Sequence, residues 1–586
     1  PTRSEVDKAH RTNNWLDIGI PSFHNVLSSS LGKRKKFYWW MLALSSLPLH
    51  LCYNSVIYMS LSAQTYAVIE FGPETKAAIE NNTYHPSNLT MDGWGIDNRF
   101  FNHQIYADAY RAGRLQELSL RECIDAYSTA FQSTRGNVFL VVDKSVMPTG
   151  DVAVVFPKID IDSPGTCSAT TGTEWVYKQF KSRAGKCLSQ ETDRFLPMLQ
   201  ANTSTWAPLN GHPVKRCLSE PTGQKCKLNF NVPLAIVVIV FNAIKALTVL
   251  AAIIELRNDP LLTIGDAAAS FLETPDSLSE NMCLISQKDI HGTSSRLELQ
   301  KPLAYTIQRP TWASSVKEGK LHTVWLSLFT AIALLASLLA WGYSSIRGQK
   351  NIDSVLRIGL SSADPRTIIR STYISSHGFS GIIQNTLLAN GPQVILSMIY
   401  FSYNATITSM LVAHEWSGFF SRSKSLRVSN NVSGLQRSTY FLQLPYRYAL
   451  PLLAFSALLQ WLASQSLSVV QIFVPSDQRW EIRCGSDFVT LSYSPLGILL
   501  SLIVIILLST TLFILGRKKL SSMPVVGSCS AAIAASCHAG PSEQVPWEKN
   551  LKWGALAQPT NARGFHIGHC GLTSSTVERP VAGAFY

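Results

Sequence analysis

The most distinct feature of the chain is a set of six long apolar stretches separated by polar segments. A helix needs about 20 apolar residues to cross the hydrocarbon core of a bilayer. Each stretch reaches about that length, and the last one reads SPLGILLSLIVIILLSTTLFIL. We therefore predict transmembrane helices at residues 37–59, 228–254, 323–343, 387–412, 448–467 and 494–515. The predicted fold class is an all-α polytopic membrane protein with a small disulfide-stapled α+β external domain.

Basic residues next to the apolar stretches set the predicted topology. The run Lys33-Arg34-Lys35-Lys36 precedes the first stretch, and GRKKL (516–520) follows the last. The positive-inside rule places both flanks on the cytosolic side. The predicted cytosolic segments are 1–36, 255–322, 413–447 and 516–586, and the predicted external segments are 60–227, 344–386 and 468–493.

Residues 60–227 form the one connecting segment long enough for a sizeable external domain. Ser119 and Glu122 have the spacing of a capping box, which opens a helix. The runs VFLVVD (138–143) and DVAVVFP (151–157) are typical of short strands. We expect a mixed α+β domain here.

Two cytosolic segments carry further local signals. Thr263 and Asp266 also have capping-box spacing, so a short helix is expected after them. That helix either lies at the membrane surface or packs beneath the bundle. The tail, 516–586, is rich in Gly, Ala, Ser and Pro, and we expect it to be mostly irregular.

Sequons and cysteines support an oxidising, external side. The glycosylation candidates, each followed by the x-Ser/Thr of a sequon, are Asn81, Asn88 and Asn202. An even number of cysteines suits a disulfide framework, and the six candidates are Cys123, Cys167, Cys187, Cys217, Cys226 and Cys484. Six cysteines allow 15 pairings, so the connectivity stays open. The cysteines expected to be reduced on the cytosolic side are Cys283, Cys529, Cys537 and Cys570.

The net charge of +13 does not predict a nucleic-acid partner, because the basic residues gather at the membrane flanks and form no basic–aromatic motif.

The chain begins at Pro1 without an apolar signal stretch, which we interpret as a fragment or a processed product.

Several distinctive runs carry a family resemblance. They are NWLDIGIPS (14–22), LALSSLPLHLCYNS (42–55), FQSTRGNVFLVVD (131–143), NFNVPLAIVVIVFN (229–242), GDAAASFLETPD (265–276), EWSGFF (415–420), LRVSNN (426–431), QRSTYFLQLPYRYALP (436–451) and MPVVGSCSAAIAASCH (523–538). With these runs the chain resembles an uncharacterised fungal family of multipass membrane proteins with a domain of unknown function. The resemblance implies about two further spans upstream of Pro1, and so about eight helices in the intact protein. It implies no activity, substrate or catalytic residue.

A search for catalytic motifs gives no candidate. No Walker loop, G-x-G-x-x-G, G-x-S-x-G or H-E-x-x-H pattern occurs. The cysteines and histidines of the tail match no standard zinc spacing. We therefore predict no catalytic residue, no cofactor and no metal site, and no enzymatic activity.

Polar residues inside the apolar stretches form the candidate site. Those of each stretch share one helical face, which should turn inward in a bilayer. The members of this intramembrane polar seam are His50, Asn54, Asn242, Lys245, Gln393, Asn404 and Gln460. The seam either holds the helices together or lines a path for a polar solute. The interiors of the stretches contain no Asp or Glu, which favours packing over proton-driven transport.

Lys245 is the most unusual member of the seam. We expect it to lie near His50 or Asn404 and to donate hydrogen bonds there. The leading hypothesis for function is a non-catalytic receptor, scaffold or surface component, and the alternative is a transporter or channel that uses the seam. The expected partners are the lipid bilayer and a protein that binds the external domain. The expected location is the plasma membrane or another membrane of the secretory pathway.

Overall fold

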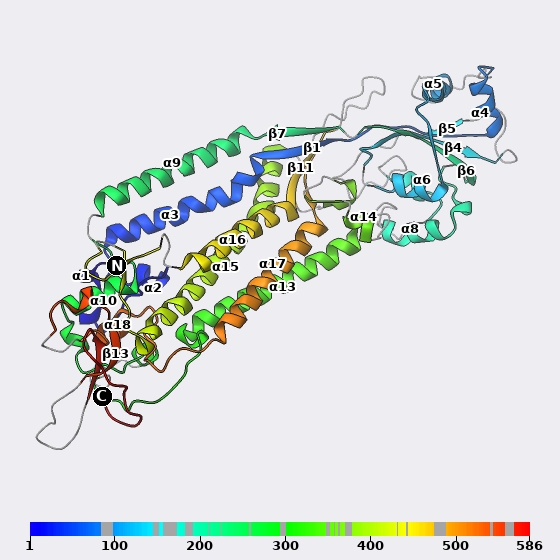
Figure 1. Ribbon diagram of the computed structural model, residues 1–586. Coiled ribbons are helices and arrows are strands. Elements are labelled where there is room, and N and C mark those ends of the chain that lie inside the picture. The colour runs from blue at the N-terminus through cyan, green and yellow to red at the C-terminus, as the bar shows by residue number, and fades with distance from the viewer. Residues whose placement is uncertain are drawn as a thin grey trace, which may run out of the picture.

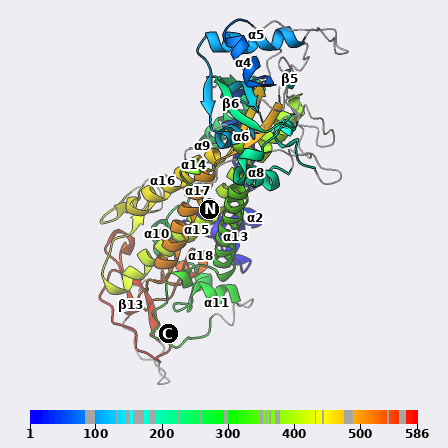
Figure 2. The same cartoon turned by 90° about the vertical axis from the view of Figure 1, so that its right-hand side faces the viewer.

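The computed structural model is an elongated molecule with a helical bundle between two smaller domains (Figure 1). Both chain ends lie in the domain at one end of the bundle (Figure 1), and strands and short helices form the domain at the other end (Figures 1 and 2). The structure describes residues 1–83, 98–129, 131–143, 152–155, 173–181, 191–209, 211–223, 225–256, 259–292, 300–346, 352–356, 358–360, 364–369, 378–429, 432–440, 444–473, 488–538, 543–556 and 568–586.

The described residues form six long helices in the bundle. They are α3 (Lys33–Cys52), α9 (Val232–Glu255), α13 (Glu318–Ser345), α15 (Gly378–Ser421), α16 (Tyr446–Ser466) and α17 (Pro495–Gly516). Two of them have clear start signals, because the side chains of Asn231 and Ser494 cap α9 and α17. A proline follows each cap, where its missing N–H costs nothing.

Large apolar side chains on the outside of the bundle are exposed. On α9 they include Ile239, Leu247 and Ile253, and on α13 they include Leu326 and Phe329. Such a continuous apolar surface suits lipid rather than water. Inside the bundle, a separate apolar core joins α13, α15, α16 and α17.

The predicted fold class, an all-α protein with six membrane spans, is wrong. Among the described residues, four helices are long and apolar enough to cross a membrane, namely α9, α13, α15 and α17. Helix α3 falls short because its first turn is basic and its apolar part ends at Cys52, and α16 carries Arg447, Gln460 and Gln465. The four candidate spans are typical of a membrane protein, while the described residues also form four β-sheets.

A five-stranded sheet, here called the junction sheet, caps one end of the bundle. Its order is β7-β1-β11-β12-β8, and its strands are β7 (Cys226–Phe230), β1 (Ile57–Ser62), β11 (Leu467–Phe473), β12 (Phe488–Tyr493) and β8 (Ile368–Ile369). β1 pairs parallel with β11 and antiparallel with β7. The sheet replaces the end of the predicted span 37–59 and parts of the predicted loops 344–386 and 468–493.

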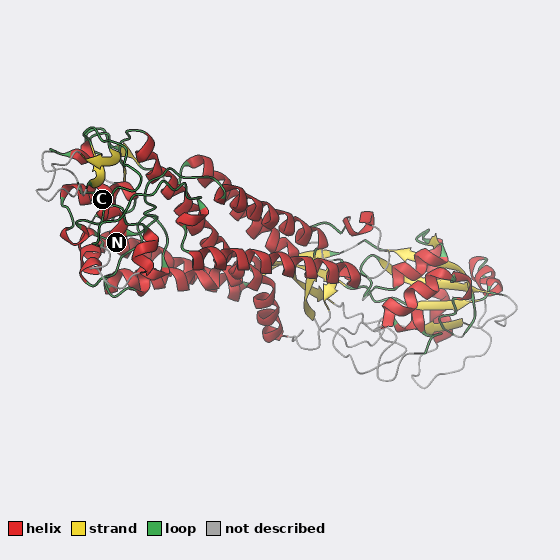
Figure 3. Ribbon diagram, turned by 90° about the horizontal axis from the view of Figure 1, so that it is seen from below, coloured by secondary structure: helices red, strands yellow, loops and turns green. Residues whose placement is uncertain are grey.

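The head domain lies beyond the junction sheet (Figure 3). Its sheet has the order β3-β6-β4-β2-β5, with strands β2 (Val68–Phe71), β3 (Gln116–Leu118), β4 (Arg135–Val142), β5 (Val152–Val155) and β6 (Val214–Pro221). Its helices are α4 (Pro73–Glu80), α5 (Asn98–Arg111), α6 (Leu120–Tyr127), α7 (Glu174–Tyr177) and α8 (Thr192–Ala201). The predicted capping box of Ser119 and Glu122 is confirmed at the start of α6.

Two apolar clusters hold the head domain together. Tyr127, Trp175 and Trp206 are fully buried in one, and Phe71 and Tyr106 are buried in the other. The predicted strand runs 138–143 and 151–157 overlap β4 and β5, and residues 151, 156 and 157 lie outside the described residues. A disulfide between the cysteines at positions 123 and 217 joins α6 to β6.

The terminal domain contains both ends of the chain. Its elements are α1 (Arg3–Arg11), α2 (Phe23–Leu27), α10 (Ile264–Glu273), α11 (Gln287–Gly292), α18 (Ser530–Ala535), β9 (Arg427–Val428), β10 (Arg437–Ser438), β13 (Lys552–Leu556) and β14 (His569–Thr573). The other short elements in the described part of the chain are α14 (Ile352–Leu356) and the 3-10 turns Tyr53–Ser55, Thr203–Thr205, Ser277–Ser279, Ala313–Ser315, Pro365–Thr367 and Pro546–Glu548.

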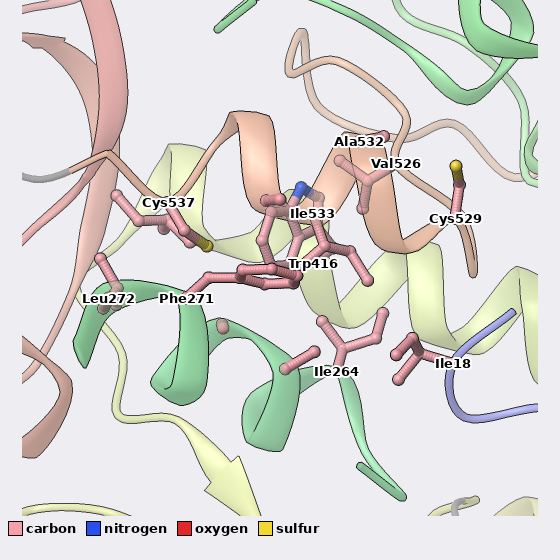
Figure 4. Packing of buried hydrophobic residues seen from close by; sticks show 14 of the residues in the cluster. Ile18, Ile264, Phe271, Leu272, Trp416, Val526, Cys529, Ala532, Ile533 and Cys537 are labelled. Atoms are coloured by element: carbon pink, nitrogen blue, oxygen red, sulfur yellow. The ribbon is translucent and has the colours of Figure 1, made fainter. Parts of the chain in front are cut away.

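A large apolar core organises the terminal domain. Phe271 of α10, Trp416 of α15 and Ile533 of α18 point toward one another (Figure 4). The predicted capping box of Thr263 and Asp266 is confirmed at the start of α10, and this helix packs in the core rather than on a membrane surface. Most of the described tail residues lie outside helices and strands, as expected, but the short elements α18, β13 and β14 all contribute to the core.

Candidate functional site

The structure divides the predicted polar seam into two separate clusters within the bundle. The first lies between α3 and α9, where the Lys245 ammonium donates a hydrogen bond of 2.8 Å to the Ser46 hydroxyl. His50 lies near enough to interact electrostatically with Lys245. His50, one of the two neighbours expected, is thus within electrostatic reach of Lys245, while the acceptor of the Lys245 hydrogen bond is the Ser46 hydroxyl.

The second cluster lies where α15 passes α3 and α16. The Asn390 amide donates to the Ser55 hydroxyl at 2.7 Å and to the Leu51 carbonyl at 2.8 Å. The Gln460 amide donates to the Ser397 hydroxyl at 2.9 Å. These contacts join helices that are far apart in the sequence.

The other predicted seam residues are placed as follows. Gln393 is buried, and its amide donates to Asn390 at 3.4 Å. Asn404 is half-buried, and its carbonyl oxygen accepts a bond of 2.7 Å from the Thr408 hydroxyl. Asn54 and Asn242 are exposed. The seven side chains therefore do not meet in one place.

A small cavity lies beside the second cluster. It measures about 20 Å³ and is lined mainly by apolar side chains of α13, α15, α16 and α17, together with Tyr400, Tyr403, Ser456 and Gln460. One water molecule needs about 10–15 Å³ when a cavity is measured in this way. The cavity has room for about one water and not for an organic solute.

The terminal domain contains a buried hydrogen-bonded relay that the sequence did not reveal. His10 contacts the Asp276 carboxylate through Nδ1 at 2.6 Å and the Ser530 hydroxyl through Nε2 at 2.9 Å. Burial opposes the charge on Asp276, but the hydrogen bond from His10 holds the pKa of this carboxyl below its usual value. The order Ser–His–Asp is the one that activates a nucleophile in hydrolases.

The surroundings of the relay favour a structural role. Ser530 is completely buried, and its hydroxyl oxygen also accepts the Leu16 amide at 3.0 Å. A substrate carbonyl therefore has no route to this oxygen in the described structure. The relay instead joins α1, the segment after α10 and the start of α18, which lie hundreds of residues apart in the sequence.

A second polar cluster in the same domain contains two thiols. Cys283 and Cys570 are buried, and their side chains are within hydrogen-bonding reach of each other. The His569 ring also contacts Cys283, and its Nε2 atom lies 3.3 Å from the His538 carbonyl oxygen. Among the described residues, no group of three or more His, Cys, Asp or Glu side chains has the arrangement of a metal site.

The predicted disulfide and glycosylation candidates lie mainly in or near the head domain. One bridge, between positions 123 and 217, is present, and Cys226 is an exposed free cysteine. Asn81 and Asn202 are exposed. The candidates that lie outside the described residues are Asn88, Cys167, Cys187 and Cys484.

Comparison with known families gives two matches. Residues 299–584 match a domain of unknown function (DUF8419), and residues 1–60 match a family of unknown function (DUF6536). These matches support an uncharacterised family. The first covers α13 to the end of the tail, and the second covers α1 to the start of β1, so the head domain lies outside both. No curated protein and no solved structure matches the chain.

Proposed function

We propose that the chain is a non-catalytic membrane receptor or scaffold, in which the head domain binds a protein partner and the bundle connects it to the terminal domain. The observation that carries this proposal is the direct joining of bundle helices to junction-sheet strands. β11 begins at the residue after α16 ends, and single capping residues separate β7 from α9 and β12 from α17. Such joints leave little room for independent movement.

Apolar contacts extend this connection into the head domain. Phe131 follows α6 of the head domain, and its ring packs with Leu61, Val470 and Ile472 of the junction sheet. A backbone bridge between Gln64 and Gln132 lies beside it. Because packed interiors resist small displacements, a shift of the head domain is passed to the strands and then to the helices.

The polar contacts of the bundle support this proposal over transport. The Lys245, Asn390 and Gln460 side chains each donate to a neighbouring bundle helix, which is how polar groups stabilise helix packing in membranes. The cavity next to Gln460 holds about one water. Transport would need these side chains to face a continuous aqueous route.

The proposal is tested on the full chain in lipid nanodiscs with an antibody fragment raised against the head domain as a surrogate partner. Hydrogen–deuterium exchange is measured with and without the fragment. We expect the fragment to change exchange both at its epitope and in β11, β12 and the adjoining turns of α16 and α17. A change confined to the epitope would contradict the proposal.

A pair of insertions provides the control. Two glycines between Ser466 and Leu467 break the direct joint between α16 and β11. Two glycines after Gly113 enlarge an open turn of the head domain, where a side chain at Gly113 would meet nothing within 4 Å. We expect the first insertion to abolish the distant exchange change in α16 and the second to preserve it.

A further inference from the structure

Two segments that are distant in the sequence bring a pair of thiols together in the terminal domain. Cys283 lies between α10 and α11, and Cys570 lies in β14. Their exposed fractions are 1% and 0%. Both residues belong to the same apolar core, and the packing of this core holds their side chains in place.

The groups around Cys283 stabilise its thiolate form. The Cys570 thiol and backbone amide both donate toward the Cys283 sulfur, and the His569 ring contacts it. The hydrogen bond from the Cys570 thiol has the largest effect, and together these hydrogen bonds lower the pKa of Cys283 to about 5 despite burial. Burial opposes a charged ring at His569, but the neighbouring Cys283 thiolate raises the pKa of this imidazole.

The two roles within the pair are distinct. The contact with the Cys283 thiolate, together with burial, raises the pKa of Cys570, so this residue keeps its proton. Cys283 is therefore the nucleophile and Cys570 the neighbouring thiol that can react with an oxidised Cys283. Glu280 adds a negative charge that favours the protonated His569 ring.

A large cavity reaches the neighbourhood of the pair. It measures about 860 Å³ and is lined by Leu284, next to Cys283, and by Tyr305. The Tyr305 phenol is near enough to Cys570 for the two side chains to interact electrostatically. A small neutral oxidant in this cavity can therefore reach Leu284, the residue next to Cys283.

Two other buried cysteines of the same domain provide a contrast. Burial raises the pKa of Cys529 to about 12, and burial also raises the pKa of Cys537. Both stay protonated at neutral pH and are poor nucleophiles. The lowered pKa of Cys283 therefore comes from the groups around it, because burial alone raises the pKa of a cysteine.

We propose that Cys283 and Cys570 form a redox-active dithiol that hydroperoxides oxidise to a disulfide. The Cys283 thiolate attacks one oxygen of hydrogen peroxide, the O–O bond breaks, and the leaving hydroxide takes the proton of the His569 imidazolium to form water. Cys283 is then a sulfenic acid. The Cys570 sulfur attacks the Cys283 sulfur, the S–S bond forms, and the S–OH oxygen leaves as a second water with the Cys570 proton. The balance is two thiols and one peroxide to one disulfide and two waters. This inference is independent of the proposed function.

The test uses the full chain in nanodiscs, treated with hydrogen peroxide, alkylated, digested and analysed by mass spectrometry. We expect a crosslinked peptide pair joining Cys283 to Cys570, which disappears after reduction. In Cys570→Ser we expect a sulfenic acid at Cys283 that a dimedone probe captures, and in the matched control Cys529→Ser we expect the disulfide to form as in the unchanged chain.

A measurement on the unchanged chain guards against variants that fail to fold. At pH 6, Cys283 should react with iodoacetamide at least about tenfold faster than Cys529, because only Cys283 is mostly thiolate there. Equal rates at the two cysteines would overturn the proposal. Oxidation of Cys283 by peroxide without a disulfide to Cys570 would overturn it. The proposal would also be overturned if the untreated chain held one zinc ion and peroxide treatment released it.

Discussion

Replacing Lys245 by methionine separates packing from transport more sharply than any other single change. Lys245 lies within α9, one of the four candidate spans, and its ammonium donates to Ser46 at 2.8 Å. Methionine keeps the length of the side chain and removes the charge. If the polar contacts only hold helices together, the folded protein loses one hydrogen bond and also loses the cost of a charge in the bilayer.

The two contributions to stability have opposite signs and different sizes. An interhelical hydrogen bond in a membrane is worth about 0.6 kcal/mol on average. A lysine in the middle of a membrane helix costs about 2.5–3.5 kcal/mol. Lys245→Met should therefore stabilise the protein by roughly 2 kcal/mol. Ser46→Ala, which keeps the charge and removes its acceptor, should destabilise it by about 0.6–1.7 kcal/mol.

Thermal unfolding of the full chain in nanodiscs, followed by the fluorescence of its tryptophans, measures both variants. We expect the melting temperature to rise by several degrees for Lys245→Met and to fall for Ser46→Ala. A Lys245→Met protein that melts below the unchanged chain would refute the packing argument, since it would show that the ammonium makes contacts worth more than its cost in the bilayer.

Three further predictions concern the two smaller domains. A methyl group on Gly265 would lie 2.1 Å from the Arg427 carbonyl oxygen, so Gly265→Ala should destabilise the terminal domain by about 1–3 kcal/mol in denaturant unfolding. The control, Gly319→Ala in bundle helix α13, where a methyl group would meet nothing within 4 Å, should instead be neutral or stabilising by up to about 1 kcal/mol. Cys123→Ser removes a bridge that spans 94 residues, and calorimetry should show a loss of about 2–4 kcal/mol in the head domain with no change elsewhere. Burial opposes the charge on Asp17, yet the Lys320 ammonium and two serine hydroxyls hold the pKa of this carboxyl below its usual value. The free energy of unfolding that Asp17 contributes should be fully present above the unfolded pKa of about 4, and it should be lost as the pH falls through the lowered folded pKa. Asp17→Asn should flatten this part of the curve of stability against pH.

Local signals in the sequence were sufficient for the long helices and for two capping boxes. The apolar run of 494–515 and the box of Ser119 and Glu122 act within a few residues, so their outcome depends little on the rest of the chain. Local signals were not sufficient to predict where α3 ends. Residues after Cys52 are apolar enough for a helix, but Met59 pairs with Val470 in the junction sheet, and that partner is more than 400 residues away.

The candidate sites follow the same rule. A lysine in an apolar stretch is visible in the sequence, and so Lys245 could be singled out, but its acceptor Ser46 depends on which helices pack together. The relay of His10, Asp276 and Ser530 has no local spacing at all, because each member comes from a different segment. Only the packing of the terminal domain brings such residues together.

Solute flux in proteoliposomes tests the central claim, that the polar groups of the bundle hold helices together and do not form a path. The full chain is reconstituted and assayed with labelled amino acids, sugars and inorganic ions, with empty liposomes and Gln460→Leu as controls. We predict no flux above empty liposomes for either protein, because the Gln460 amide is bonded to Ser397 and the adjacent cavity holds about one water. Saturable flux through the unchanged chain that Gln460→Leu abolishes, with folding intact, would contradict the account.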